Sequence, residues 1–250
     1  MNENKLIINA DDFGYSDNIN AAIVSCFQKD IINSTTIMVN MEGFDEAVKL
    51  AREHGFADKI GLHINLTEGK PLTDFSGTGL IDENGVFIME AISNPLIFFS
   101  HITKNKIKYE IREQYNKLVA SGITPTHFDS HQHVHILPYL VPLFIEFTKE
   151  KKQKIRIVTI PMRKNFFIIA YNLLLNSRLK RNKINFSDKF GNIRYFNYYL
   201  DKKKNFKPVF EIMVHPAFKG DKLVDYFFNT DIEQKISHIK ELYKLKNSTK

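Results

Sequence analysis

Apolar residues along this chain form short, mainly apolar runs that alternate with segments of helical periodicity. The runs are rich in β-branched residues and have the length of strands that are buried on both faces. They cover residues 5–10, 35–39, 60–66, 155–160 and 209–214. Because strand and helix alternate without an intervening linker, the pattern predicts an α/β fold with a parallel sheet.

Between these runs the apolar positions recur at helical spacing. Ile19, Ile23 and Phe27 lie on one side of a predicted first helix, which Ser16 or Asp17 is placed to cap. Further helices are predicted over residues 44–54, 109–120, 138–149 and 231–245. The histidine-rich segment 127–135 falls between two of them and is predicted to begin at the end of another strand.

Residues 162–207 break this rhythm and are rich in Phe, Asn and Lys. We expect a single domain over residues 1–250 with an irregular insertion at about 162–207. Within it, an apolar run at 166–175 is followed by basic residues at 178–183. This composition favours core packing or a homodimer interface over contact with a membrane surface.

Composition narrows the class of protein. A chain of 250 residues with 43% hydrophobic content can bury one substantial core. The formal net charge is +7, but the basic residues are scattered and lack an interleaved aromatic platform, so we expect no nucleic-acid partner. The N-terminus lacks the pattern of a signal peptide, and no apolar run reaches the roughly 18 residues of a membrane span. We therefore expect a cytoplasmic protein.

The single cysteine, Cys26, lies in the predicted first helix and cannot form an internal disulfide. We interpret it as a small buried hydrophobic residue rather than a nucleophile. Because the chain has no pair of cysteines, any bound metal must be held by nitrogen and oxygen ligands.

Polar residues capable of chemistry lie near the carboxyl ends of several predicted strands. Asp11 and Asp12 follow the first strand, His63 interrupts the third, and His215 follows the last. Active sites of barrels and open α/β sheets assemble at this edge, so we expect these segments and the 127–135 segment to meet there. Each residue also has a structural alternative: an aspartate can cap the next helix, and a strand histidine can be a hydrogen-bonded core residue.

The 127–135 segment holds four of the nine histidines of the chain. In extended backbone its odd-numbered residues share one face, and in a helix every fourth residue does. Either conformation brings imidazoles together beside a carboxylate, which suits a divalent metal. The alternative is a surface tract of unrelated histidines. The residues concerned are His127, Asp129, His131, His133 and His135.

These motifs resemble the YdjC-like carbohydrate deacetylase family, which includes chitooligosaccharide deacetylases and relatives from hopanoid biosynthesis. The matching segments are LIINADDFG at 6–14, STT at 34–36, GLH at 61–63, THFDSHQHVH at 126–135 and VHPAF at 214–218. The resemblance covers residues 6 to about 143 and 209–218, and it does not extend to 162–207. It implies a distorted (β/α) barrel of about seven mainly parallel strands, related to polysaccharide deacetylases.

The resemblance also implies roles for individual residues, including a divalent ion that the family is usually taken to bind as Mg²⁺. Imidazole ligands suit Zn²⁺, Mn²⁺, Co²⁺ or Ni²⁺ better, so the residues themselves leave the metal open. The implied metal ligands are Asp12, His63 and His131, the general base is Asp11, and the general acid is His215. The residues implied to support the ligands or contact the substrate are His127, Asp129, His133 and His135.

The function implied is hydrolysis of the N-acetyl group of an acetylated amino sugar or oligosaccharide, by a metal-activated water with aspartate and histidine as base and acid. Two other classes are compatible with clustered histidine and aspartate. A metal-dependent phosphoesterase or another amidohydrolase on the same barrel would need a second set of metal ligands, or basic side chains that bind a phosphate group. A non-catalytic sugar- or metal-binding protein would have no need for the second carboxylate of the Asp11–Asp12 pair.

Overall fold

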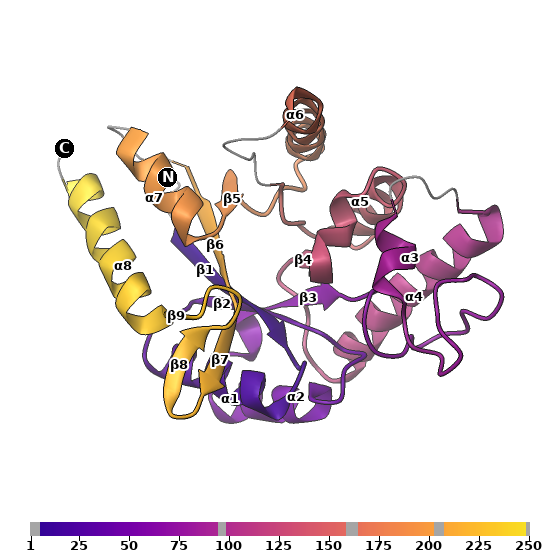
Figure 1. The fold of residues 1–250 in the computed structure, drawn as a ribbon, viewed down its shortest axis with the longest axis horizontal. Helices are drawn as coiled ribbons and strands as arrows, with labels where there is room; N and C mark the ends of the chain where they lie inside the picture. The colour runs from indigo at the N-terminus through magenta and orange to yellow at the C-terminus, as the bar shows by residue number, and fades with distance from the viewer. Residues whose placement is uncertain (1–5, 95–98, 159–164, 203–207, 249–250) are drawn as a thin grey trace.

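The computed structural model describes residues 6–94, 99–158, 165–202 and 208–248. Its centre is a parallel sheet of six strands in the order β4-β3-β2-β1-β6-β5, which curls into a half-barrel (Figure 1). The predicted α/β fold with a parallel sheet is therefore confirmed. The strands are β1 (Leu6–Phe13), β2 (Ser34–Ile37), β3 (Ile60–Ile64), β4 (Phe128–Ser130), β5 (Lys189–Gly191) and β6 (Phe210–Val214).

Isolated backbone bridges connect the two edges of this half-barrel. Ile155 forms parallel bridges with Phe128 in β4 and with Asn185, which precedes β5. We predicted a strand over residues 155–160; its last two residues lie outside the described residues, and the rest is one bridge rather than a strand. Three residues further on, the backbone N–H and C=O of Val158 both bind the side chain of Asn176. Among the described residues the sheet has six strands, close to the seven or so expected.

The two faces of the curled sheet differ in chemistry. Ile8, Leu62 and Ile212 belong to the hydrophobic core that the helices cover. Each of these residues has a buried polar neighbour in the sequence: Asn9, His63 and Glu211, respectively. Because successive side chains of a strand point to opposite faces, these polar side chains lie on the inner face. The sequence thus builds an apolar layer outside the half-barrel and a charged layer inside it.

The helices largely follow the predicted segments. The helix expected from residue 109 begins earlier, at His101, because the Ser100 hydroxyl accepts a hydrogen bond from the Thr103 N–H at 3.0 Å. The helix expected from Pro138 begins later, at Val141. The helices before residue 160 are α1 (Asp17–Gln28), α2 (Phe44–Glu53), α3 (Met89–Ser93), α4 (His101–Ala120) and α5 (Val141–Glu150).

The stretch 162–207, expected to be irregular, contains regular elements in most of its described part. It forms α6 (Phe166–Arg181), the edge strand β5 and α7 (Ile193–Lys202). The helical period of α6 is hard to detect in the sequence because both of its faces are apolar. Asn172, Leu175, Asn176 and Leu179 are buried, whereas apolar side chains such as Phe166 and Leu174 on other faces are exposed. The expectation of irregular structure is therefore wrong for these residues.

A small antiparallel sheet that the sequence analysis did not predict follows β6 directly. It consists of β7 (Pro216–Lys219), β8 (Lys222–Asp225) and β9 (Thr230–Asp231), and it leads into α8 (Ile232–Ser248) (Figure 1). His215 lies at the junction between the two sheets. None of the helices among the described residues has the length and apolar character needed to cross a membrane.

Candidate active site

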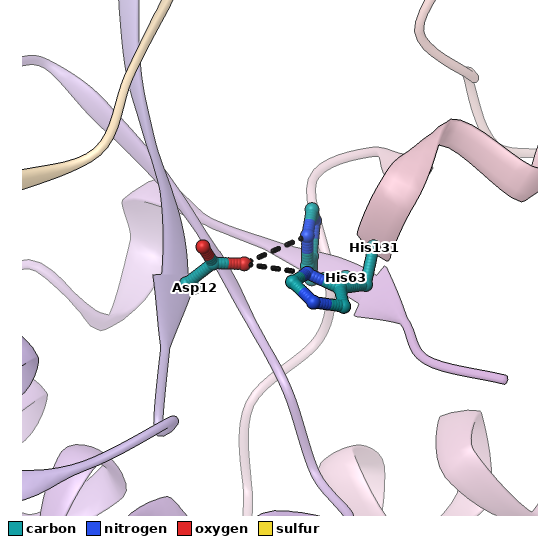
Figure 2. Close-up of side chains that lie close together, drawn as sticks. All are labelled: Asp12, His63 and His131. Carbon is teal, nitrogen blue, oxygen red and sulfur yellow. Dashed lines mark hydrogen bonds and ion pairs between the residues drawn. The ribbon is translucent and has the colours of Figure 1, made fainter. Parts of the chain in front are cut away.

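One carboxylate and two imidazoles converge at the carboxyl edge of the sheet (Figure 2). Asp12 lies in β1, His63 in β3, and His131 at the start of a short 3₁₀ segment (His131–Ile136) that follows β4. The Oδ1 atom of Asp12 is 3.1 Å from Nε2 of His63 and 2.9 Å from Nδ1 of His131. All three residues are at most 4% exposed. The expected trio of residues is thus brought together in the structure.

An irregularity in β1 explains how both adjacent aspartates reach the site. The register of β1 against β2 shifts between Ala10 and Phe13, and Asp12 has a positive φ of 71°. In a regular strand, neighbouring side chains point to opposite faces. The register shift is a β-bulge, and a bulge redirects one of the two side chains. Asp11 and Asp12 therefore line the same cavity. Positive φ at a residue other than glycine costs free energy and is concentrated at functional sites.

A second carboxylate contacts the ring of His63 on the side opposite Asp12. Its Nδ1 lies 2.7 Å from Oδ1 of Asp129, the residue paired with it in β4. The other oxygen of Asp129 accepts a hydrogen bond from the hydroxyl of Thr36 at 3.0 Å. Because Nδ1 is engaged in this way, the Nε2 atom of His63 faces Asp12.

A buried arginine that the sequence analysis missed binds three carboxylates inside the half-barrel. Arg156 is 0% exposed and binds both oxygens of Asp11, at 2.6 and 2.7 Å. It also lies 2.7 Å from Asp129 and 2.6 Å from Glu211, whose second oxygen accepts a hydrogen bond from Ser187. The guanidinium thus fixes the orientation of Asp11 and neutralises part of the charge that burial would otherwise make costly.

These contacts perturb the pKa of each group. Burial acts to raise the pKa of Asp11, but the charge and hydrogen bonds of Arg156 outweigh it and hold the pKa below its ordinary value. Burial likewise opposes ionisation of Asp12, but hydrogen bonds from His131 and His63 keep its pKa well below the usual range. Burial lowers the pKa of His63, but Asp129 and Asp12 raise it to about 10. The two aspartates are therefore ionised, and the proton on His63 balances part of their negative charge.

The donor set of Asp12, His63 and His131 fits a divalent metal ion. Ligand atoms about 2.1 Å from a metal and at right angles to one another are about 3.0 Å apart. The two nitrogens lie 3.1 and 2.9 Å from the same oxygen of Asp12, in agreement with that spacing. The contact of His63 with Asp129 matches the carboxylate–histidine–metal arrangement. A cation at this point would replace the imidazole protons, which links metal binding to proton release.

The site opens into a cavity of about 310 Å³. His215 is in its wall, and the Nδ1 atom of His215 is buried without a hydrogen-bond partner among the described residues. The backbone N–H of His215 is fixed by the carboxylate of Asp225 at 3.1 Å. Besides the aspartates and histidines already described, the lining consists of Ser130, Gln132, His133, Met213, Phe227 and Phe228.

The histidine-rich segment is extended through β4, as in one of the two conformations considered from the sequence, but it departs from that conformation after His131. After β4 the chain turns sharply, with positive φ at Gln132 and His133, so its side chains diverge. His131 reaches Asp12 and His133 lines the cavity. His135 instead binds the hydroxyl of Ser130 through Nδ1, at 2.7 Å.

His127 is directed away from the cavity, into the interior of the half-barrel. Its ring stacks on Phe186 with centroids 3.7 Å apart, and Nδ1 contacts the Thr126 hydroxyl at 2.9 Å. Burial lowers the pKa of His127 to about 3, so the ring is neutral at pH 7. Gly61 makes room for it, because a Cβ there would lie 2.6 Å from the imidazole.

Arg156, Glu211, Glu68 and Tyr226 contact the charged groups of the site but had no role in the sequence analysis. Arg156 and Glu211 each interrupt an apolar run, and a charge inside a buried strand is a signal that sequence reasoning could have used. Glu68 contacts Nε2 of His131 at 3.2 Å, and the hydroxyl of Tyr226 donates to Oδ2 of Asp12 at 3.1 Å. Those two residues lie in loops, where the sequence gives no comparable signal.

Comparison with known proteins identifies the family. The family model described as YdjC-like protein matches residues 5–249. The chain belongs to the YdjC-like family. This match confirms the resemblance stated from the motifs and extends it through the stretch 162–207, which the motifs did not cover.

Individual relatives agree with this assignment. A carbohydrate deacetylase of Brevibacillus brevis is 34% identical over 224 residues, which cover 86% of this chain and 82% of the relative. A chitooligosaccharide deacetylase of Proteus mirabilis is 31% identical over 223 residues, or 85% of this chain and 81% of the relative. The crystal structure of an Enterococcus faecalis protein described as a candidate cellobiose-phosphate cleavage protein shares the fold. Its TM-score is 0.73 at 23% identity, and the match covers 98% of this chain and 95% of that one.

Proposed function

We propose that this protein is a metal-dependent carbohydrate deacetylase that hydrolyses the N-acetyl group of an acetylated amino sugar or oligosaccharide. The observation that carries the proposal is the convergence of Asp12, His63 and His131 in one cavity with a second carboxylate, Asp11, and a histidine, His215. Relatives that match over most of this chain are a carbohydrate deacetylase and a chitooligosaccharide deacetylase, which supports the same reaction.

Asp12, His63 and His131 would hold the metal ion. When bound, a divalent ion polarises the acetyl carbonyl and lowers the pKa of a coordinated water. Imidazole ligands favour Zn²⁺, Mn²⁺, Co²⁺ or Ni²⁺ on chemical grounds, and Mg²⁺ is the ion implied by the family resemblance.

Asp11 would be the general base that takes the proton from the attacking water. Its carboxylate is ionised at neutral pH because Arg156 lowers its pKa, and both of its oxygens are fixed by the same guanidinium. Asn9 adds a hydrogen bond to Oδ1 at 2.8 Å. This arrangement presents a negatively charged acceptor in one orientation, at some cost in basicity.

His215 would be the general acid. As the C–N bond breaks, the amine nitrogen of the sugar needs a proton, and an imidazolium in the cavity wall can supply it. His215 lines the cavity, which places its ring beside a bound substrate. The products are acetate and the free amino sugar. Asp129 and Thr36 would act indirectly, by holding the ring of His63.

The proposal is tested by assaying metal-stripped protein for acetate release from N-acetylated mono- and oligosaccharides after adding Mg²⁺, Mn²⁺, Co²⁺, Ni²⁺ or Zn²⁺. Phosphate release from sugar phosphates is measured in parallel. We expect acetate release that requires added metal. Phosphate release without acetate release would favour the phosphoesterase alternative, and saccharide binding without either product would favour a binding protein.

The residue roles are tested with Asp11→Asn, with Asp45→Asn on the exposed side of α2 as the matched control. Asp11→Asn should retain metal by elemental analysis and lose turnover by about 100-fold or more, because general-base catalysis contributes this much. Near-normal turnover would remove Asp11 from the role of base. His131→Ala should bind metal poorly, and an unchanged metal content would contradict its assignment as a ligand.

A further inference from the structure

Three consecutive aromatic residues, Tyr226, Phe227 and Phe228, form the turn between β8 and β9 at the mouth of the cavity. Phe227 and Phe228 line the same cavity as the candidate catalytic residues. Their side chains nevertheless remain 54% and 37% exposed. An apolar surface that borders a polar cavity and stays open to solvent is typical of a ligand-binding wall.

Hydrogen bonds fix this turn to the backbone of His215. The carboxylate of Asp225, which is 1% exposed, accepts from the N–H of His215 at 3.1 Å and from the N–H of Phe228 at 3.2 Å. In return, the N–H of Tyr226 donates to the carbonyl of His215 at 3.0 Å. The exposed rings are therefore carried on a preorganised turn, which reduces the entropy lost when a ligand is bound.

The aromatic side chains also contact the candidate catalytic groups directly. The hydroxyl of Tyr226 donates to Oδ2 of Asp12, and the ring of Tyr226 stacks on that of Phe227 with centroids 4.2 Å apart. The ring of Phe227 meets His215 edge to face at 4.3 Å. The exposed apolar surface thus begins next to the group that we assign as general acid.

We propose that Phe227 and Phe228 form a sugar-binding subsite that stacks against the pyranose ring carrying the acetamido group. The C–H bonds on one face of a pyranose make that face apolar, and aromatic rings can remove it from water. The scissile nitrogen is bonded directly to this sugar ring. A substrate whose nitrogen faces His215 therefore places its pyranose beside Phe227, the ring packed on His215. This inference rests on the deacetylase function proposed above.

The subsite selects for ring-bearing acetamides over acetamides in general. The metal-binding and catalytic groups act on the acetamido moiety, which many small amides share. The aromatic surface adds binding contacts only for a substrate in which this moiety is attached to a ring at the cavity mouth. We therefore assign specificity for N-acetylated pyranosides to Phe227 and Phe228, and the chemistry to the residues behind them.

The decisive variant is Phe228→Ala, because Phe227 also packs on His215 and its loss would disturb the acid. The substrates are diacetylchitobiose and N-acetylethanolamine, an acetamide without a ring. We expect Phe228→Ala to lower kcat/KM for diacetylchitobiose about fivefold or more, mainly through KM, and to leave N-acetylethanolamine within about twofold. Phe228→Tyr should retain the wild-type preference. The matched control is Phe167→Ala on α6, which removes a 77% exposed ring outside the cavity lining.

A binding measurement separates this inference from the proposed function. Metal-stripped wild type, Phe228→Ala and Phe167→Ala are titrated with diacetylchitobiose in a calorimeter, and only Phe228→Ala should bind more weakly. If the wild type binds the saccharide but releases no acetate with any metal, the proposed function fails while the subsite stands. Equal binding by Phe228→Ala and wild type, or equal loss of kcat/KM on both substrates, would overturn the subsite.

Discussion

Acid should destabilise this protein in part through His127, and the effect can be calculated. His127 is 0% exposed and is stacked on Phe186 inside the half-barrel. Burial lowers the pKa of His127 from 6.5 to about 3. The folded state therefore excludes a proton that the unfolded chain accepts once the pH falls below 6.5. The contribution to stability is complete above pH 6.5 and is lost progressively as the pH falls toward 3.

The magnitude follows from proton linkage. Between pH 7 and pH 5 the unfolded chain protonates His127 almost fully while the folded state does not, which lowers the free energy of unfolding by about 2 kcal/mol. His127→Asn removes the titration. The variant loses the ring stack as well, but that loss is present at both pH values and cancels in the difference between them.

The assay is urea denaturation of metal-stripped protein at pH 7 and pH 5, which gives the change in free energy of unfolding for each variant. We expect the change to be about 2 kcal/mol smaller for His127→Asn than for wild type. The matched control is His238→Asn, because the exposed ring of His238 on α8 is in water in both states. A pH-dependent change equal in His127→Asn and wild type would refute the reasoning.

Three further predictions concern the interior of the half-barrel and the residues around the candidate site. Arg156→Met leaves three buried carboxylates without their cation and should lower the free energy of unfolding by about 3 kcal/mol or more, whereas Lys108→Met, at an exposed ion pair, should change it by less than about 1 kcal/mol. Gly61→Ala places a Cβ 2.6 Å from the ring of His127 and should cost about 1–3 kcal/mol. Part of that cost should be recovered in the double variant with His127→Ala. Tyr226→Phe removes the hydrogen bond to Asp12, the carboxylate that we propose as a metal ligand, and should weaken metal affinity about tenfold by metal titration.

Each of these outcomes can fail separately. Equal stability of Arg156→Met and Lys108→Met would mean that the buried carboxylates need no cation. Full additivity of Gly61→Ala and His127→Ala in a double-mutant cycle would show that the two sites do not touch. Unchanged metal affinity in Tyr226→Phe would show that its hydroxyl does not orient the carboxylate.

The order of strands and helices could be predicted because buried parallel strands and amphipathic helices leave different periods in a sequence. This reasoning located five of the six strands of the parallel sheet to within a few residues, including β4 at the start of the histidine segment, but none of the three strands of the antiparallel sheet. It failed where the signal is short or symmetric. β5 has three residues, and α6 is apolar on opposite faces, so neither shows the period that its structure would ordinarily produce.

The candidate site could likewise be predicted only in part from the sequence. The sequence predicted that Asp11, Asp12, His63, His131 and His215 would meet, because side chains at the carboxyl ends of parallel strands share one edge whatever the details of packing. The structure brings all five to one cavity. This part of the prediction depends only on the order of strands, which the periodicity of the chain determines by itself.

Only the tertiary structure decided which histidines of the 127–135 segment diverge and which buried charges hold the site in place. His131 contacts Asp12 whereas His127 packs against Phe186, and positive φ at Gln132 and His133 turns the chain away after β4; no periodicity encodes that turn. Arg156 lies 145 residues from Asp11 in the sequence, yet it binds both oxygens of that carboxylate. Such pairings arise because burial obliges each charge to find a partner in space, and closure of the sheet selects the partner.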